Sequence, residues 1–199
     1  GKQVWPSYVA EHYQTDELCP TSLAVGDVEL LVPPVTVKSC LELIQKPVSA
    51  TDPSPWLHRF GGIQVARNQG MSGSHALTSD ASDATNTIVQ FVDNRCFSKT
   101  LGRTYEITAW VKIMQGKRVY KCDPLNEKCP EAGLDTIWGR SRMASIDSSV
   151  ETKDGFQLIK GRFQVTEELA SGDKVGIFLK SNVGDGLTWF IDEVSVALV

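Results

Sequence analysis

The sequence lacks any long hydrophobic run, since none approaches the roughly 20 apolar residues that a membrane-spanning helix needs. It also lacks an excess of positive charge, because 20 Lys and Arg stand against 24 Asp and Glu, a net charge of −4. This balance gives no electrostatic reason to expect nucleic acid or an anionic membrane as a partner. Helical periodicity is absent except at residues 165–170, and no internal repeat occurs. The chain is therefore predicted to contain almost no helix.

The sequence also lacks the short motifs that mark common catalytic sites. No GxSxG, HExxH or phosphate-binding glycine loop occurs, and the histidines (His12, His58 and His75) lie in segments without a recognisable nucleophile. The chain is predicted not to be an enzyme. Glycoside hydrolysis stays the minority interpretation, because the spacing of a glycosidase's two carboxylates is spatial and leaves no sequence motif.

Five cysteines are present, and their positions indicate disulfides formed in an oxidising compartment. Cys122 and Cys129 lie in the short polar loop KCDPLNEKCP and are predicted to pair, with free thiols or a metal site as the alternatives. A zinc site would need about four ligands, and no second close cysteine pair occurs. Cys40 and Cys96 each border a predicted strand and could join the two. Cys19 is then the odd cysteine, either free or paired outside the chain.

The first 39 residues are interpreted as an N-terminal extension or edge arm, with a remnant of a preceding domain as the alternative. Residues 28–37 (VELLVPPVTV) are apolar and β-prone, but Pro33 and Pro34 prevent a continuous central strand. The chain begins with glycine and no signal-like segment follows, so we expect a processed product or an excised domain. The cysteines favour an extracellular, secreted or cell-surface location. No N-x-S/T sequon occurs to support it.

From residue 40 onward, short β-prone segments alternate with turn signals, which is typical of a β-sandwich or barrel. A chain of 199 residues is long enough for one such domain with a sizeable core. Strands are predicted at 41–45, 56–66 (two strands hinged at Gly61 and Gly62), 87–92, 104–114, 136–145, 156–165 (with a bulge at Gly161), 174–180 and 188–199.

The closing segment TWFIDEVSVALV organises the prediction, because a strand at the end of the domain must return to complete a sheet. Phe190, Val194 and Val196 share one parity, and Asp192 falls on this apolar side. A carboxylate there is costly unless it is paired, hydrogen-bonded or bound to a metal. In the segment 104–114 the apolar and polar residues alternate most clearly, and Trp110 falls on the polar side.

Several segments resemble, in order, the motifs of carbohydrate-binding modules of the galactose-binding-like β-sandwich type, similar to families 4, 9 and 22. They are LELIQKP (41–47), SGSHAL (72–77), GRTYEITAWVKI (102–113), FQLIKGRFQVTEE (156–168) and WFIDEVSV (189–196). The resemblance covers about residues 40–199. It implies an all-β, antiparallel β-sandwich of jelly-roll type at 40–199. Because this fold carries many functions, it is less specific for the ligand.

The resemblance also implies a possible structural calcium. Members often carry a glutamate after the opening strand, which joins a late aspartate and backbone carbonyls around the ion. Asp192 matches the late aspartate, but the opening turn reads KPVSA (46–50) and has no carboxylate, although Asp52 could substitute. Calcium prefers six to eight oxygen ligands. The alternative is that backbone donors and hydroxyls hold Asp192.

Sugar binding requires aromatic rings for the C–H faces and planar polar groups for the hydroxyls. Trp110 lies among polar neighbours on its strand, and Trp138 shares parity with two arginines in DTIWGRSRM. The predicted ligand-binding residues are Trp110, Trp138, Gln90, Arg140, Arg142 and Arg162. The alternative for Trp110 is coverage by the arm or a loop, and Trp189 is interpreted as packing.

The sequence thus predicts non-catalytic binding of a polysaccharide or glycoprotein glycan on a concave sheet face. The alternative is a structural or adhesion ectodomain that contacts other extracellular proteins through the arm or the loop of Cys122 and Cys129. Exposure of Trp110 and Trp138 in one groove would favour glycan binding.

Overall fold

A computed structural model of the chain describes residues 38–47, 51–60, 62–79, 86–125, 128–152, 154–182, 184 and 186–199. The segment Val35–Val199 forms one compact unit. The predicted arm, apart from Lys38 and Ser39, and Cys19 lie outside the described residues. Within those residues, no helix is both long and apolar enough to cross a membrane.

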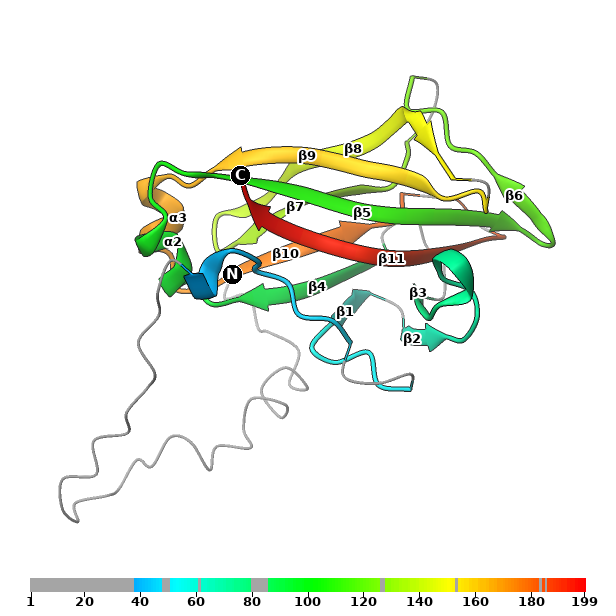
Figure 1. Ribbon diagram of the computed structural model, residues 1–199, viewed down its shortest axis with the longest axis horizontal. Helices are drawn as coiled ribbons and strands as arrows, with labels where there is room; N and C mark the ends of the chain where they lie inside the picture. The colour runs from blue at the N-terminus through cyan, green and yellow to red at the C-terminus, as the bar shows by residue number, and fades with distance from the viewer. Residues whose placement is uncertain are drawn as a thin grey trace, which may run out of the picture. The chain divides into compact units, whose positions relative to one another are not determined.

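The described residues form an antiparallel sheet of 11 strands, which folds into the two layers of a β-sandwich (Figure 1). The first layer has the order β1 (Leu57–Phe60), β4 (Thr87–Val92), β10 (Val175–Lys180), β7 (Glu131–Thr136). The second has the order β9 (Gln157–Gln164), β5 (Thr104–Gln115), β11 (Leu187–Leu198), β3 (Ala76–Ser79), β2 (Ile63–Ala66), with β6 (Arg118–Tyr120) paired to β5. Short helices are η1 (Lys38–Cys40), η2 (Met71–Gly73), α2 (Arg95–Lys99) and α3 (Glu167–Ser171).

The long strand β8 (Gly139–Glu151) connects the layers, because its first half pairs with β7 and its second half with β9. Gly161 of β9 allows β8 and β9 to approach closely, since a Cβ at this position would lie 2.0 Å from the Met143 carbonyl oxygen of β8. The bulge predicted at Gly161 is wrong. The register between β5 and β9 runs through it without a shift.

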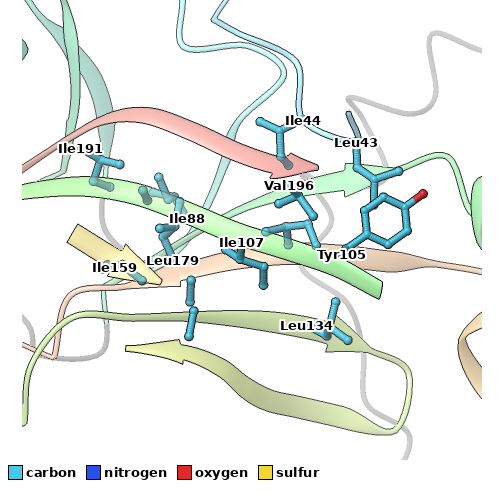
Figure 2. Close-up of a cluster of buried hydrophobic side chains, with 14 of the residues drawn as sticks. Leu43, Ile44, Ile88, Tyr105, Ile107, Leu134, Ile159, Leu179, Ile191 and Val196 are labelled. Carbon is cyan, nitrogen blue, oxygen red and sulfur yellow. The ribbon is translucent and has the colours of Figure 1, made fainter. Parts of the chain in front are cut away.

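Alternation along β5 builds the centre of the core. Tyr105, Ile107 and Ala109 are fully buried, and the residues between them are only half-buried, as the sequence predicts. In Figure 2, Ile107 of β5 and Val196 of β11 lie near Leu179 of β10, between the layers. The described strands therefore enclose one continuous hydrophobic core.

The segment predicted as one strand at 136–145 is instead a hairpin. β7 ends at Thr136, the chain turns through Ile137 and Trp138, and β8 begins at Gly139. The turn is closed by Thr136, whose Oγ1 accepts a hydrogen bond from the Trp138 amide at 3.2 Å and donates one to the Gly139 carbonyl at 3.1 Å. Gly139 has a positive φ of 129°, which favours glycine at this position.

The first half of the closing strand faces the other way from the prediction, in which Phe190 and Asp192 were on the core-facing side. Trp189 and Ile191 of β11 point into the core, and the register against β5 shifts between Asp192 and Ser195. One extra residue is accommodated there, with Glu193 in the left-handed region (φ 46°). Asp192 consequently lies on the outward side rather than on the apolar side.

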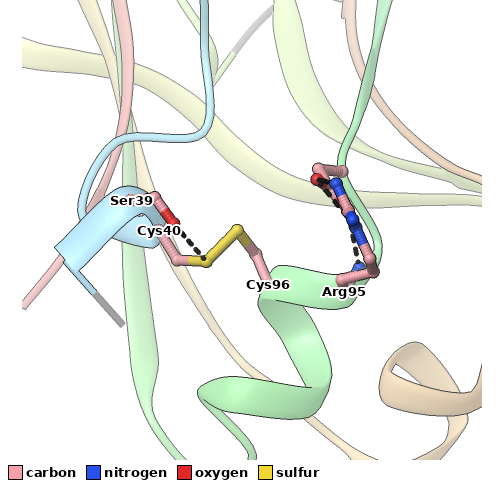
Figure 3. A network of polar contacts seen from close by, with 5 residues as sticks. Ser39, Cys40, Arg95 and Cys96 are labelled. Carbon is pink, nitrogen blue, oxygen red and sulfur yellow. Dashed lines mark hydrogen bonds and ion pairs between the residues drawn. A yellow bond between two sulfur atoms is a disulfide. The ribbon is translucent and has the colours of Figure 1, made fainter. Parts of the chain in front are cut away.

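Both predicted disulfides are present. Cys40 of η1 is bonded to Cys96 of α2 (Figure 3), and Cys122 is bonded to Cys129. The first joins the start of the described chain to the end of the sandwich near α2. Tyr105 reinforces this junction, because its hydroxyl donates a hydrogen bond of 2.8 Å to the Cys40 carbonyl oxygen.

Candidate functional site

The outward side of the first layer carries Arg140 and Arg142, two of the four polar side chains predicted for the site. Residues paired across antiparallel strands point to the same side of a sheet, and successive residues point to opposite sides. Ile88, Ile177 and Leu134 face the core, so their neighbours in β4, β10 and β7 face outward. We call this outward side the polar face; it comprises Thr87, Val89, Phe91, Glu131, Asp135, Arg140, Arg142, Phe178 and Lys180.

Two glycines make room for the aromatic rings on the polar face. A Cβ at Gly133 would lie 3.0 Å from Phe178 Cε1 and 2.0 Å from the Ser141 carbonyl oxygen. A Cβ at Gly176 would lie 2.6 Å from a methyl carbon of Val89. Glycine at these positions therefore allows the side chains of Phe178, Phe91 and Val89 to pack closely on the strands. We call these three side chains the floor of the polar face.

Arg140 is held on this floor by contacts with Asp135, Thr87 and Phe178. Its Nε lies 3.6 Å from Asp135 Oδ2, and its Nη1 donates a hydrogen bond of 3.3 Å to Thr87 Oγ1. Its Cζ lies 5.7 Å from the centre of the Phe178 ring, within the range of a cation–π interaction. The side chain is 26% exposed. Arg140 thus presents one restrained edge of its guanidinium to solvent.

Arg142 follows on the same face and is far more open. Its Nη1 lies 3.9 Å from Glu131 Oε2, which is an ion pair but too long for a hydrogen bond, and its side chain is 67% exposed. A planar guanidinium with open donors can bind two oxygen atoms of a ligand at once. Arg142 is therefore better placed than Arg140 to contact a ligand directly.

Among the described residues, one tryptophan is largely exposed, and it lies at the end of the polar face. Trp138 is at the tip of the hairpin between β7 and β8, next to the paired residues Asp135 and Arg140, and it is 74% exposed. An exposed indole offers a flat apolar ring with a polar N–H, which can stack on a ligand and donate a hydrogen bond to it. Trp138, Arg140 and Arg142 are the predicted site residues that the structure brings together.

Gln90 is a correction to the predicted site. It faces the core and is 1% exposed. Its Nε2 donates to the Gln45 carbonyl at 3.0 Å, and its Oε1 accepts from the Gln45 amide at 2.7 Å. These bonds fix the segment after η1 onto the sandwich. A buried amide with both ends occupied positions the backbone and does not contact a ligand.

Trp110 and Arg162 lie outside the polar face, so the expectation that Trp110 and Trp138 share one groove is wrong. Trp110 pairs with Leu158 of β9, which in turn pairs with Asp147 of β8. Asp147 is nine residues from Trp138, which corresponds to about 30 Å of extended strand. Sequence parity could not show this separation, because it depends on strand order.

Arg162 lies on the second layer, where it forms an ion pair with Glu106. Its Nε donates a hydrogen bond of 2.8 Å to Glu106 Oε2, and Lys160 Nζ lies 3.4 Å from the same oxygen. The hydrogen bond from Arg162 lowers the pKa of the Glu106 carboxyl, against the opposing effect of burial. Arg162 and Trp110 thus belong to the outward side of the second layer.

No protein-family model matches the sequence, and no curated protein matches it. Solved structures share its fold. The CBM22-1 and GH10 modules of endo-1,4-β-D-xylanase 10B of Clostridium thermocellum, complexed with xylohexaose, match 80% of this chain and 28% of that chain at 11% identity, with a TM-score of 0.56. The xylan-binding CBM22-2 domain of Paenibacillus barcinonensis Xyn10C matches 80% of this chain and 99% of that chain at 13% identity, with a TM-score of 0.55.

A third structure, a family 16 carbohydrate-binding module, matches 79% of this chain and 98% of that chain at 12% identity, with a TM-score of 0.50. The chain has the β-sandwich fold of these carbohydrate-binding modules. The resemblance predicted from the sequence is thus confirmed for the fold. At this level of identity the likeness extends to the fold alone, so the ligand must be argued from the residues of the polar face.

The residues around Asp192 do not fit the calcium implied by the family resemblance. Asp192 Oδ2 accepts hydrogen bonds from the Met71 amide at 2.8 Å and the Ser74 hydroxyl at 2.7 Å, and its Oδ1 accepts from the Glu193 amide at 2.8 Å. A cation needs converging oxygen acceptors, whereas N–H and O–H donors converge here. Among the described residues, no group of three or more His, Cys, Asp and Glu could hold a metal.

The acids and the aromatic floor of the polar face were not predicted from the sequence. Asp135 pairs with Arg140 and Gly133 pairs with Arg142 in the hairpin of β7 and β8, so hairpin pairing would have placed Asp135 opposite Arg140 and Glu131 further along the same face. Phe178 and Lys180 alternate with core residues in KVGIFLK, a period-two signal that was available. The missing information was the hairpin turn at Ile137 and Trp138.

Proposed function

We propose that this chain is a non-catalytic, extracellular glycan-binding module whose polar face binds a polysaccharide or the glycan of a glycoprotein. One observation carries the proposal: a single sheet face presents two guanidiniums, each beside a carboxylate, and ends at the exposed indole of Trp138. The two disulfides support the extracellular location, since disulfides persist in oxidising compartments.

The chemistry of the face suits a sugar chain. The C–H side of a sugar ring packs on an indole, and the Trp138 side chain offers its ring to solvent at the hairpin tip. Sugar hydroxyls both donate and accept hydrogen bonds, so a face of arginines and carboxylates can bind them from several directions. The fold is shared with a xylan-binding domain, which makes a plant-type polysaccharide a reasonable first probe.

We expect Trp138→Ala to weaken retention by a binding polysaccharide about tenfold, by analogy with nucleic-acid bases, whose stacking on an aromatic side chain contributes about 1–3 kcal/mol. Native affinity gels containing a panel of neutral and acidic polysaccharides measure this retention. The matched control is Ile137→Ala, which removes the other exposed apolar side chain of the same turn (61% exposed). Trp110→Ala controls for loss of a tryptophan elsewhere.

Retention that survives in Trp138→Ala but is lost in Trp110→Ala would contradict the placement of the site on the polar face. The same incubations, assayed for new reducing ends, test the non-catalytic part of the proposal. We expect none to form, and their release by the wild-type chain would contradict it.

The second candidate function is protein contact, and one observation favours it. Leu125, in the loop closed by the Cys122–Cys129 disulfide, is 90% exposed. A leucine held in a disulfide-closed loop can pack into an apolar pocket of a partner protein with little loss of backbone freedom. If no polysaccharide retards the protein, this loop becomes the surface to test.

A further inference from the structure

A cavity of about 310 Å³ opens at the end of the polar face opposite Trp138. Its walls come from the start of β7, the end of β10, the first half of β8 and the loop closed by the Cys122–Cys129 disulfide; Glu131, Arg142, Lys180 and Lys128 all line it. A volume of this size is within the range of small-ligand sites, roughly 300–1,000 Å³. The cavity is continuous with the polar face, because Glu131, Arg142 and Lys180 belong to both.

The described lining of this cavity is strongly cationic. It contains the three cations Lys128, Arg142 and Lys180 and a single carboxylate, that of Glu131. The whole chain carries a net charge of −4, so the local positive charge runs against the overall balance. A concave site lined by one sign of charge concentrates ligands of the opposite sign. The cavity is therefore suited to an anionic group.

The described carboxylates of the cavity are too few to neutralise its cations. Glu131 lies 3.9 Å from Arg142 and is the cross-strand partner of Lys180, so one carboxylate faces two cations. Arg140, by contrast, is held by Asp135 and Thr87. Among the described residues of the cavity, three cations thus face one carboxylate, which leaves a net charge of +2.

The wall that carries Lys128 is anchored to the sandwich. Asn182 donates a hydrogen bond of 3.1 Å from Nδ2 to the Cys129 carbonyl, next to Lys128. Gln157 holds the other end of the loop, because its side-chain amide donates to the Cys122 carbonyl and accepts from the Cys122 amide, both at 3.0 Å. With the disulfide, these bonds place Lys128 near the cavity before any ligand arrives, which reduces the entropic cost of binding.

We propose that the glycan bound by the polar face is acidic, and that the carboxylate of a uronic acid residue occupies this cavity beside Arg142, Lys180 and Lys128; the proposal rests on the proposed function. The planar fork of Arg142 matches a carboxylate. Thr136, which begins the turn that carries Trp138, is five residues from Glu131, or about 17 Å along β7. One oligosaccharide can therefore contact Trp138 and place an acidic residue in the cavity.

The test compares a double variant, Lys128→Gln with Arg142→Gln, against a matched double variant, Lys117→Gln with Arg118→Gln. Both remove one lysine and one arginine, but Lys117 and Arg118 are exposed in the hairpin of β5 and β6. Affinity gels and calorimetry use polygalacturonate and glucuronoxylan as carboxylated probes, a carrageenan as a sulfated probe, and unsubstituted xylan as a neutral probe.

We expect the wild-type chain to bind a carboxylated probe more tightly than the neutral one, with affinity that falls as salt is added. The cavity variant should bind that probe about tenfold more weakly, as for the loss of a hydrogen bond between charged groups, while the matched variant binds like the wild type. Equal weakening in both double variants would contradict the claim that the cavity binds the acidic residue. Tighter binding of the carrageenan than of the carboxylated probes would contradict the claim that the bound group is a carboxylate. Binding of neutral xylan, lost in Trp138→Ala and without any preference for carboxylated probes, would overturn this inference and leave the proposed function standing. Failure of every glycan would overturn both.

Discussion

The double replacement Cys40→Ala with Cys96→Ala is expected to lower the free energy of unfolding by about 4 kcal/mol. A disulfide restricts the unfolded chain in proportion to the logarithm of the loop that it closes, and for a sequence separation of 56 this chain-entropy estimate gives about 4 kcal/mol. The bond also fixes η1 to α2, where Cys40 and Phe97 are fully buried and the Tyr105 hydroxyl binds the Cys40 carbonyl.

Urea denaturation followed by tryptophan fluorescence measures this loss. The matched comparison is Cys122→Ala with Cys129→Ala, in which the sequence separation is 7 and the same estimate gives about 2.5 kcal/mol. The first variant should therefore unfold at a clearly lower urea concentration than the second. The opposite order would contradict the structural role assigned to the Cys40–Cys96 bond.

Asp192→Ala is expected to lower the free energy of unfolding by about 3 kcal/mol, because it removes three hydrogen bonds of about 1 kcal/mol each. These bonds attach η2 to β11 through Met71 and Ser74 and support the bulge at Glu193. Without the carboxylate, the bulge loses the acceptor for its amide. Thermal or urea denaturation measures the loss.

The control is Asp173→Ala, which removes an exposed carboxylate and should change stability by less than about 0.5 kcal/mol. We also expect the melting temperature of the wild-type chain to be the same with a chelator as with added calcium, since donors rather than acceptors surround Asp192. A chelator that lowers the melting temperature by several degrees would show that the implied calcium is bound after all.

Local pattern was sufficient for much of the fold. The alternation in β5 placed Tyr105 and Ile107 in the core, and two segments bordered by cysteines correctly indicated the Cys40–Cys96 bond. Two predictions were wrong because local pattern does not reveal a tight turn or a one-residue bulge. A turn ends a strand, and a bulge exchanges the side chains that face the core with those that face outward. Trp138 lies in a hairpin turn rather than in a strand, and the bulge at Glu193 reverses the facing of β11.

The candidate site was predicted less well, because strand order is not a local property. Gln90 could not be rejected from the sequence, because both sides of β4 carry apolar residues, Ile88 and Val92 on its own side and Val89 and Phe91 on the other. Trp110 could not be rejected either, because its outward facing is correct and only the register through β9 shows how far it lies from Trp138. Arg162 was likewise outward but is already bound to Glu106.

The most direct test of the central claim is an NMR titration of the tryptophan indole N–H signals with whichever oligosaccharide binds. The chain has five tryptophans, and Trp138→Phe and Trp110→Phe identify the two signals that matter. The polar-face account predicts that the Trp138 indole signal and the backbone amides of Arg140 and Arg142 shift, while the Trp110 signal stays in place. A Trp110 signal that moves while Trp138 remains unchanged would contradict the account and place the site on the second layer.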